Sequence, residues 1–186
     1  MKLISAAAVM VAVQMCAACS LDFFADEPEP MAAYLIHDSR WNGKTFPLVH
    51  LCARDGGDAM SPIFKVENIP AGTNVLLVEF NDVANPKLAV GGGLGTLGYY
   101  HESGATEALL EPVKGGKVKV KDYAFTEKSH RVKNRPPAGY LPLCLDTRPH
   151  MLTATIKAVR RTGTFENSKT EVLAEDYVDV GGLWRK

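Results

Sequence analysis

The side chains that most often carry out chemistry, those of histidine, cysteine and serine, match no catalytic or metal-binding motif in this sequence. No two of the five histidines stand four residues apart, the spacing that presents two metal ligands on one face of a helix. Ser61 is followed by Pro62 and lacks the GxSxG turn that exposes the nucleophile of many hydrolases. We therefore expect no metal site, and we expect a protein that is not an enzyme, with a hydrolase as a distant alternative.

A glycine-rich stretch from Gly93 to Gly98 matches the GxGxxG pattern of dinucleotide-binding sites. That pattern binds a cofactor only where a strand precedes it and a helix starts at the glycines. Two tyrosines and Gly104 follow here, which favours no helix, and no alternation of strands and helices surrounds the stretch. We expect a glycine loop and no cofactor.

The first residues have the form of a secretory signal. Lys2 supplies a positive charge, and an apolar run of about 13 residues follows, which is too short to span a bilayer. Ala17-Ala18-Cys19 then resembles a lipoprotein cleavage site, at which Cys19 would carry the lipid. Ordinary cleavage near Ala18 is the alternative. We expect a signal peptide over 1–19, an acidic, proline-bearing tether over 20–40 and a domain over 41–186, lipid-anchored in the cell envelope and facing the periplasm.

Two cysteines remain after the leader, Cys52 and Cys144, and neither belongs to a CxxC pair. An exported protein is in an oxidising compartment, where a disulfide is the simple expectation. Two buried free thiols are the alternative.

The charge balance limits the kinds of partner. Lysine and arginine number 21, aspartate and glutamate number 21, and the net charge is zero. Nucleic acid is therefore not expected as the main partner, because phosphate binding needs a basic surface. A small molecule or a protein, whose identity the sequence does not indicate, remains as the partner, beside the membrane through Cys19.

Alternation of apolar and polar residues predicts a mostly β domain with antiparallel sheets. Only Ala105–Leu110 has the pattern of a helix. The basic segment Lys128–Arg135 reads as a solvated loop. The expected strands are Val75–Phe80, Lys117–Tyr123, Thr153–Val159 and Glu171–Val180.

Two blocks of the sequence resemble the bacterial exported branch of the phosphatidylethanolamine-binding protein (PEBP) family, also called Raf kinase inhibitor-like proteins. The family's first block reads roughly C-x-G-x-x-x-S-P, then P-x-G-T, an apolar strand and D-P-D-x-P; its second reads G-Y-x-x-P-C, then H-R-Y before another strand. The resemblance covers about residues 41–184. The matching residues are Cys52, Gly57, Ser61, Pro62, Pro70, Gly72, Thr73, Asp82 and Pro86 in the first block and Gly139, Tyr140, Cys144 and His150 in the second.

The resemblance implies a sandwich of a large and a small antiparallel β-sheet with short peripheral helices, and a Cys52–Cys144 disulfide. It also implies an anion pocket at one end, to which Asp82, Pro86 and His150 would contribute. Other family positions differ in this sequence: the second Asp is Ala84, one His falls near Gly95, and the Arg and Tyr of H-R-Y are Met151 and Leu152. His101 is a candidate replacement for the missing histidine.

The altered positions predict a degenerate anion pocket, because an anion in a neutral cleft needs several convergent donors. We expect phosphate-type ligands to bind only at about millimolar concentration or worse, since each lost charge-assisted hydrogen bond is worth roughly 1.5–3 kcal/mol. The expected function is therefore non-catalytic binding of a small ligand or a partner. The alternative is a structural or interaction lipoprotein with a vestigial pocket.

Overall fold

The computed structural model describes residues 28–36, 46–117, 120, 122–133, 139–163 and 167–183. The expected signal peptide over 1–19 and its Cys19 lie outside these residues. Among the described residues, no helix is long and apolar enough to cross a membrane.

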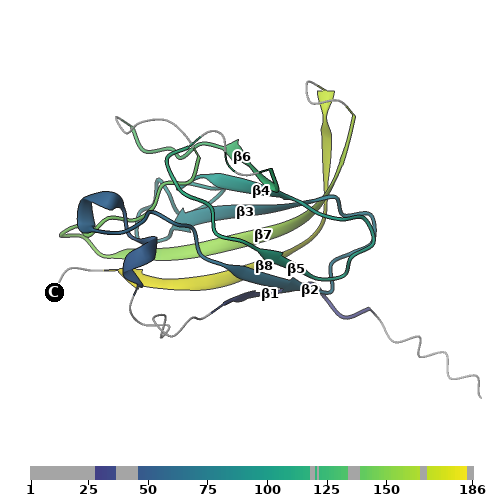
Figure 1. The fold of residues 1–186 in the computed structure, drawn as a ribbon, viewed down its shortest axis with the longest axis horizontal. Helices are drawn as coiled ribbons and strands as arrows, with labels where there is room; N and C mark the ends of the chain where they lie inside the picture. Colours follow the sequence, from purple (N-terminus) through teal and green to yellow (C-terminus); the bar gives the residue numbers. More distant parts are fainter. Residues whose placement is uncertain are drawn as a thin grey trace, which may run out of the picture.

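Within the described residues, eight strands form two antiparallel sheets (Figure 1). The small sheet has the order β1-β2-β5, and the large sheet has the order β6-β4-β3-β7-β8. Two short 3-10 helices, η1 (Leu48–His50) and η2 (Ala53–Asp55), lie at one end of the sheets. The strands are β1 (Ala32–Leu35), β2 (Phe64–Glu67), β3 (Val75–Asp82), β4 (Thr96–Tyr100), β5 (Ala108–Leu110), β6 (Ala124–Lys128), β7 (His150–Thr162) and β8 (Lys169–Leu183).

The core lies between the two sheets. In β3, every second side chain, Leu76, Val78 and Phe80, is buried on the face toward the small sheet. Phe64 of β2 contacts Phe80 across the core, with ring centroids 6.3 Å apart. Antiparallel sheets alternate in this way when one face packs on a core. The predicted class, a mostly β sandwich of a large and a small sheet with short helices at its periphery, is confirmed.

Three of the expected strands, Val75–Phe80, Thr153–Val159 and Glu171–Val180, lie within β3, β7 and β8. The strand expected over Lys117–Tyr123 is wrong: Lys117, Val120, Asp122 and Tyr123 are not in a strand, and β6 begins only at Ala124. The alternating pattern was misleading because pairing with β4 determines where this strand lies: Ala124 pairs with Tyr99, and Phe125 pairs with Gly98.

The helix expected over Ala105–Leu110 is also wrong. Ala108–Leu110 form β5, which pairs with β2, and Leu110 is buried in the core. Helix propensity is a weak preference that a short segment loses once its backbone pairs with a sheet.

The folded domain begins before residue 41. Strand β1 lies inside the range 20–40 that we expected to be a tether, and it pairs with β2 from Ala32↔Glu67 to Leu35↔Phe64. Met31 and Ala33 are buried in the core. The tether expected over 20–40 therefore does not extend to residue 40.

Candidate functional site

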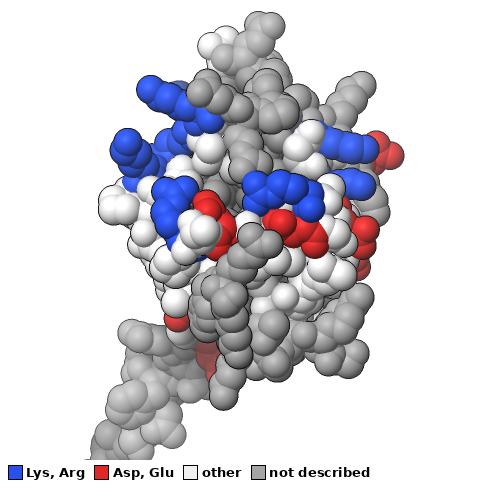
Figure 2. Space-filling view, turned by 90° about the vertical axis from the view of Figure 1, so that its left-hand side faces the viewer, with Lys and Arg blue, Asp and Glu red and all other residues white. Residues whose placement is uncertain are grey.

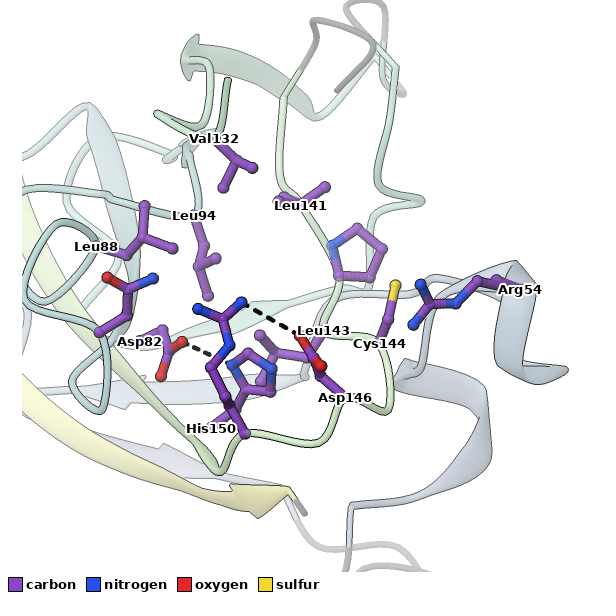
Figure 3. Close-up of a pocket in the computed structure, with 13 residues that line it drawn as sticks. Arg54, Asp82, Leu88, Leu94, Val132, Leu141, Leu143, Cys144, Asp146 and His150 are labelled. Carbon is purple, nitrogen blue, oxygen red and sulfur yellow. Dashed lines mark hydrogen bonds and ion pairs between the residues drawn. The ribbon is translucent and has the colours of Figure 1, made fainter. Parts of the chain in front are cut away.

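A cavity of about 120 Å³ opens at the end of the large sheet where β3 ends and β7 begins. Because these strands are antiparallel, the end of β3 lies beside the start of β7, with Asp82 opposite Leu152. Leu88, Leu94, Val132, Leu141 and Leu143 form its apolar wall (Figure 3). The polar lining residues are Arg54, Asp82, Asn85, Asp146, Arg148 and His150.

Asp82 and His150 form a hydrogen-bonded pair in this cavity, with Nδ1 of His150 2.7 Å from Oδ2 of Asp82 (Figure 3). The other carboxylate oxygen accepts hydrogen bonds from the backbone N–H groups of Met151, at 3.0 Å, and Ala84, at 3.3 Å. The side chain of Asp82 is 1% exposed, whereas that of His150 is 16% exposed. With Nδ1 engaged by Asp82, Nε2 is the ring nitrogen left to contact a ligand.

The surroundings of Asp82 favour its ionised form. Burial by itself raises the pKa of the carboxyl, but the hydrogen bonds from His150 and the Met151 amide lower it by more, and the net pKa lies below its ordinary value. Asp82 is therefore a carboxylate at neutral pH, and it fixes the orientation of the His150 ring.

A second polar pair, Asp146 and Arg148, also lines the cavity. Arg148 Nη2 is 3.3 Å from Asp146 Oδ2 (Figure 3). Neither residue is among the positions expected from the sequence, and neither is Arg54, which also lines the cavity. Each stands two residues from a position that the resemblance did single out, namely Cys52, Cys144 or His150. That proximity was the available signal.

Basic side chains gather on the end of the molecule that carries the cavity, with acidic side chains directly beside some of them (Figure 2). Arg54 lies 3.5 Å from Asp55, and Arg148 is paired with Asp146. The pocket thus holds cationic groups, each already accompanied by a carboxylate.

Two of the sequence-predicted positions do not belong to this cavity. Pro86 is exposed in the turn after β3 and is not among the lining residues. His101 follows β4 at the opposite end of the sheet, where its backbone N–H bonds to Asn74 and its Nε2 lies 2.9 Å from the Ala105 carbonyl oxygen. It is roughly 25 Å from Asp82 along the strands, so it cannot replace the missing histidine.

Gly95 shows why the first family histidine has no counterpart here. Its φ is +108°, and a Cβ atom at this position would lie 2.5 Å from the carbonyl oxygen of Gly139. The backbone of the segment around Gly139 and Tyr140 therefore occupies the place of a side chain. Leu152 is fully buried in the core, and Met151 is exposed. Gly95, Met151 and Leu152 therefore supply no side-chain hydrogen-bond donor to the cavity, in agreement with the expected loss of pocket groups.

The wall of the cavity beside Cys144 is closed by a disulfide. Cys52 and Cys144 are bonded, with their Cα atoms 5.1 Å apart, within the usual range for a disulfide. The expected pairing is confirmed. Asp55 lies close to both sulfur atoms, but sulfurs that share a bond are not available as thiolate ligands, and this cluster is not a metal site.

The other sequence motifs have structural roles. Ser61 is fully buried, and its Oγ accepts a hydrogen bond from the backbone N–H of Val113 at 2.9 Å. No helix starts at the glycines of 93–98: Gly93 and Gly95 precede β4, as expected for a loop, whereas Gly98 lies within β4. Of the basic segment, Arg131 is exposed as expected, while Val132 contributes to the cavity wall.

No family model matches the sequence, and no curated protein matches it. Among solved structures, the chain is similar to a protein from Chlamydia trachomatis described as a homologue of phosphatidylethanolamine-binding protein. The TM-score is 0.50 and the identity 16%, over 84% of this chain and 99% of that one. At this identity the similarity concerns the fold alone. The fold is PEBP-like, as the sequence resemblance implied.

Proposed function

We propose that this chain is a non-catalytic binding protein of the bacterial envelope, a divergent relative of the exported PEBP branch, which holds a small ligand in the cavity beside His150. The observation that carries the proposal is the open cavity itself, which is lined by two side chains that carry N–H donors, those of His150 and Arg148. An arrangement of this kind suits a ligand with one anionic group, because both side chains are good donors to an anion.

The size and charge of the cavity restrict the ligand. A volume of about 120 Å³ is well below the 300–1,000 Å³ of typical drug-sized sites, so only a small molecule or a head group fits. Asp82 and Asp146 are the carboxylate partners of these two side chains. A phosphate dianion meets these carboxylates as well as the donors, whereas a zwitterion such as phosphoethanolamine offers an ammonium group to Asp146.

Titration calorimetry of the purified protein with inorganic phosphate and with phosphoethanolamine tests this proposal. We expect phosphoethanolamine to bind more tightly than phosphate, and phosphate to bind at about millimolar concentration or worse. Arg148→Ala and His150→Ala should each weaken phosphoethanolamine binding by roughly tenfold or more, the loss of one charge-assisted hydrogen bond.

Arg160→Ala is the matched control for the arginine variant. Arg160 is likewise exposed and paired with a carboxylate, that of Glu171 at 2.7 Å, but it lies toward the other end of β7. It should leave the affinity unchanged. Equal loss in Arg148→Ala and Arg160→Ala would place binding outside the cavity. Micromolar phosphate binding that His150→Ala abolishes would overturn the choice of a zwitterion and show a working anion pocket.

The second candidate is a structural or interaction protein whose pocket is vestigial. It is favoured by one observation: the side chains of His150 and Arg148 each already have a carboxylate partner. Under this alternative neither probe binds, and His150→Ala changes the free energy of unfolding alone.

A further inference from the structure

The turn after Cys52 binds both backbone polar groups of Leu145. The carboxylate of Asp55 accepts a hydrogen bond from the Leu145 N–H at 2.6 Å, and Nη2 of Arg54 donates to the Leu145 carbonyl oxygen at 2.8 Å. Arg54 Nη2 is also 3.5 Å from Asp55. We call this arrangement the Leu145 clasp. It lies directly beside the disulfide, since Cys144 precedes Leu145 and Cys52 precedes the turn.

The clasp acts on a segment that has no regular secondary structure. Residues 139–149 form neither helix nor strand, so contacts with other parts of the chain must hold them in place. Near the cavity these contacts are the disulfide, the clasp and two hydrogen bonds, one from the Cys52 N–H to the Leu143 carbonyl oxygen at 2.9 Å and one from the Leu141 N–H to the Leu94 carbonyl oxygen at 2.7 Å. Asp146 and Arg148, which line the cavity, follow Leu145 directly.

We infer that Asp55 is a positioning residue of the pocket, and this inference rests on the function proposed above. Asp55 does not line the cavity, and its side chain is only 15% exposed. Any effect on a ligand must therefore pass through the Leu145 peptide group or through Arg54, and only the first route changes the exchange of the Leu145 amide and the signals of Asp146 and Arg148. The disulfide fixes the position of the segment 139–149 at Cys144. Asp55 fixes the orientation of the peptide group that carries the Leu145 N–H, and this orientation sets the direction in which Asp146 and Arg148 enter the cavity.

The comparison of Asp55→Ala with Asp58→Ala tests the inference on the full-length protein. Asp58 is an exposed acid of the same loop, so its removal deletes the same charge without touching Leu145. We expect Asp55→Ala to speed amide hydrogen exchange at Leu145, to shift the NMR signals of Asp146 and Arg148, and to weaken phosphoethanolamine binding by about tenfold. Asp58→Ala should do none of these. Asp55→Asn keeps an oxygen that can accept the Leu145 N–H, and it should recover part of the affinity.

A stability control separates positioning from a general weakening of the fold. Val75→Ala removes buried side-chain atoms from the outer face of β3, away from the cavity. It should lower the free energy of unfolding and leave the phosphoethanolamine affinity unchanged. Equal losses of affinity in Val75→Ala and Asp55→Ala would overturn the inference, and so would identical behaviour of Asp55→Ala and Asp58→Ala. If the unmutated protein binds no phosphoethanolamine, the proposed function fails, and the exchange at Leu145 and the signals of Asp146 and Arg148 still decide whether Asp55 positions this wall.

Discussion

His150 and Asp82, 68 positions apart in the sequence, are joined at 2.7 Å, and the residue after His150 binds the same carboxylate through its backbone N–H at 3.0 Å. One side chain at the end of β3 thus fixes both the backbone and the side chain at the start of β7. This relationship gives the pocket its rigid side, and it leads to a prediction about pH.

Asp82→Asn should lower the free energy of unfolding at pH 7 by roughly 2 kcal/mol, because a buried carboxylate loses its charge-assisted hydrogen bonds. The pKa of Asp82 is lowered in the folded protein, so its stabilisation is present above the unfolded pKa of about 3.9 and is lost as pH falls through the folded pKa. Urea unfolding from pH 7 to pH 2 should therefore show the two proteins converging below about pH 4. A constant difference at the lowest pH would contradict this account. Asp58→Asn, at an exposed acid, is the control.

Removal of the disulfide should be costly. The two cysteines are separated by 92 residues, and a crosslink of that span is worth about 4–5 kcal/mol in the chain-entropy description. We expect the double variant Cys52→Ser/Cys144→Ser to unfold at a much lower urea concentration. Mass spectrometry of non-reduced peptides checks the bond itself, and alkylation of both thiols in protein purified from cells without reductant would show that it does not form.

Gly98 should not tolerate a side chain. It lies in the middle of β4 opposite Phe125, and a Cβ atom there would be 2.2 Å from the Phe125 ring. Gly98→Ala should lower the free energy of unfolding by about 1–3 kcal/mol through overpacking. In a double-mutant cycle with Phe125→Leu, the double variant should lose less free energy of unfolding than the sum of the losses in the two single variants. Full additivity would mean that the ring is not what excludes the side chain.

Lipidation of Cys19 remains a prediction from the leader sequence. Labelling cells with a radioactive or clickable palmitate analogue should mark the unmutated protein and leave Cys19→Ala unmarked. Equal labelling of the two proteins, or labelling of neither, would remove the anchor.

The sequence predicted the fold where long strands carry a dense apolar pattern, as in Val75–Phe80 at the centre of the large sheet. It missed β1, β2, β4, β5 and β6, because strands of three to five residues gain their stability from the strands beside them rather than from their own pattern. The Lys117–Tyr123 segment has an ideal alternation and still forms no strand in its described part.

The site was predictable where it coincides with the family blocks, at Asp82, His150 and the two cysteines. Arg54 and Arg148 could not be identified, because an isolated arginine in a loop has the same appearance in a sequence whether it faces solvent or a cavity. His101 was misassigned because it is close to the glycine loop along the chain, whereas β4 carries it to the far end of the sheet.

The position of β1 has a consequence for how the domain would be held at a membrane. The chain enters the small sheet at Ala32, opposite Glu67, at the end of the sandwich away from the cavity (Figure 1). A lipid on Cys19 would therefore attach the domain at the end away from the cavity. The segment 20–31 would span at most roughly 40 Å when fully extended. The attachment point and the mouth of the cavity would then lie at opposite ends of the domain. The anchored end of the chain would therefore leave the mouth uncovered for a ligand that arrives from the aqueous compartment.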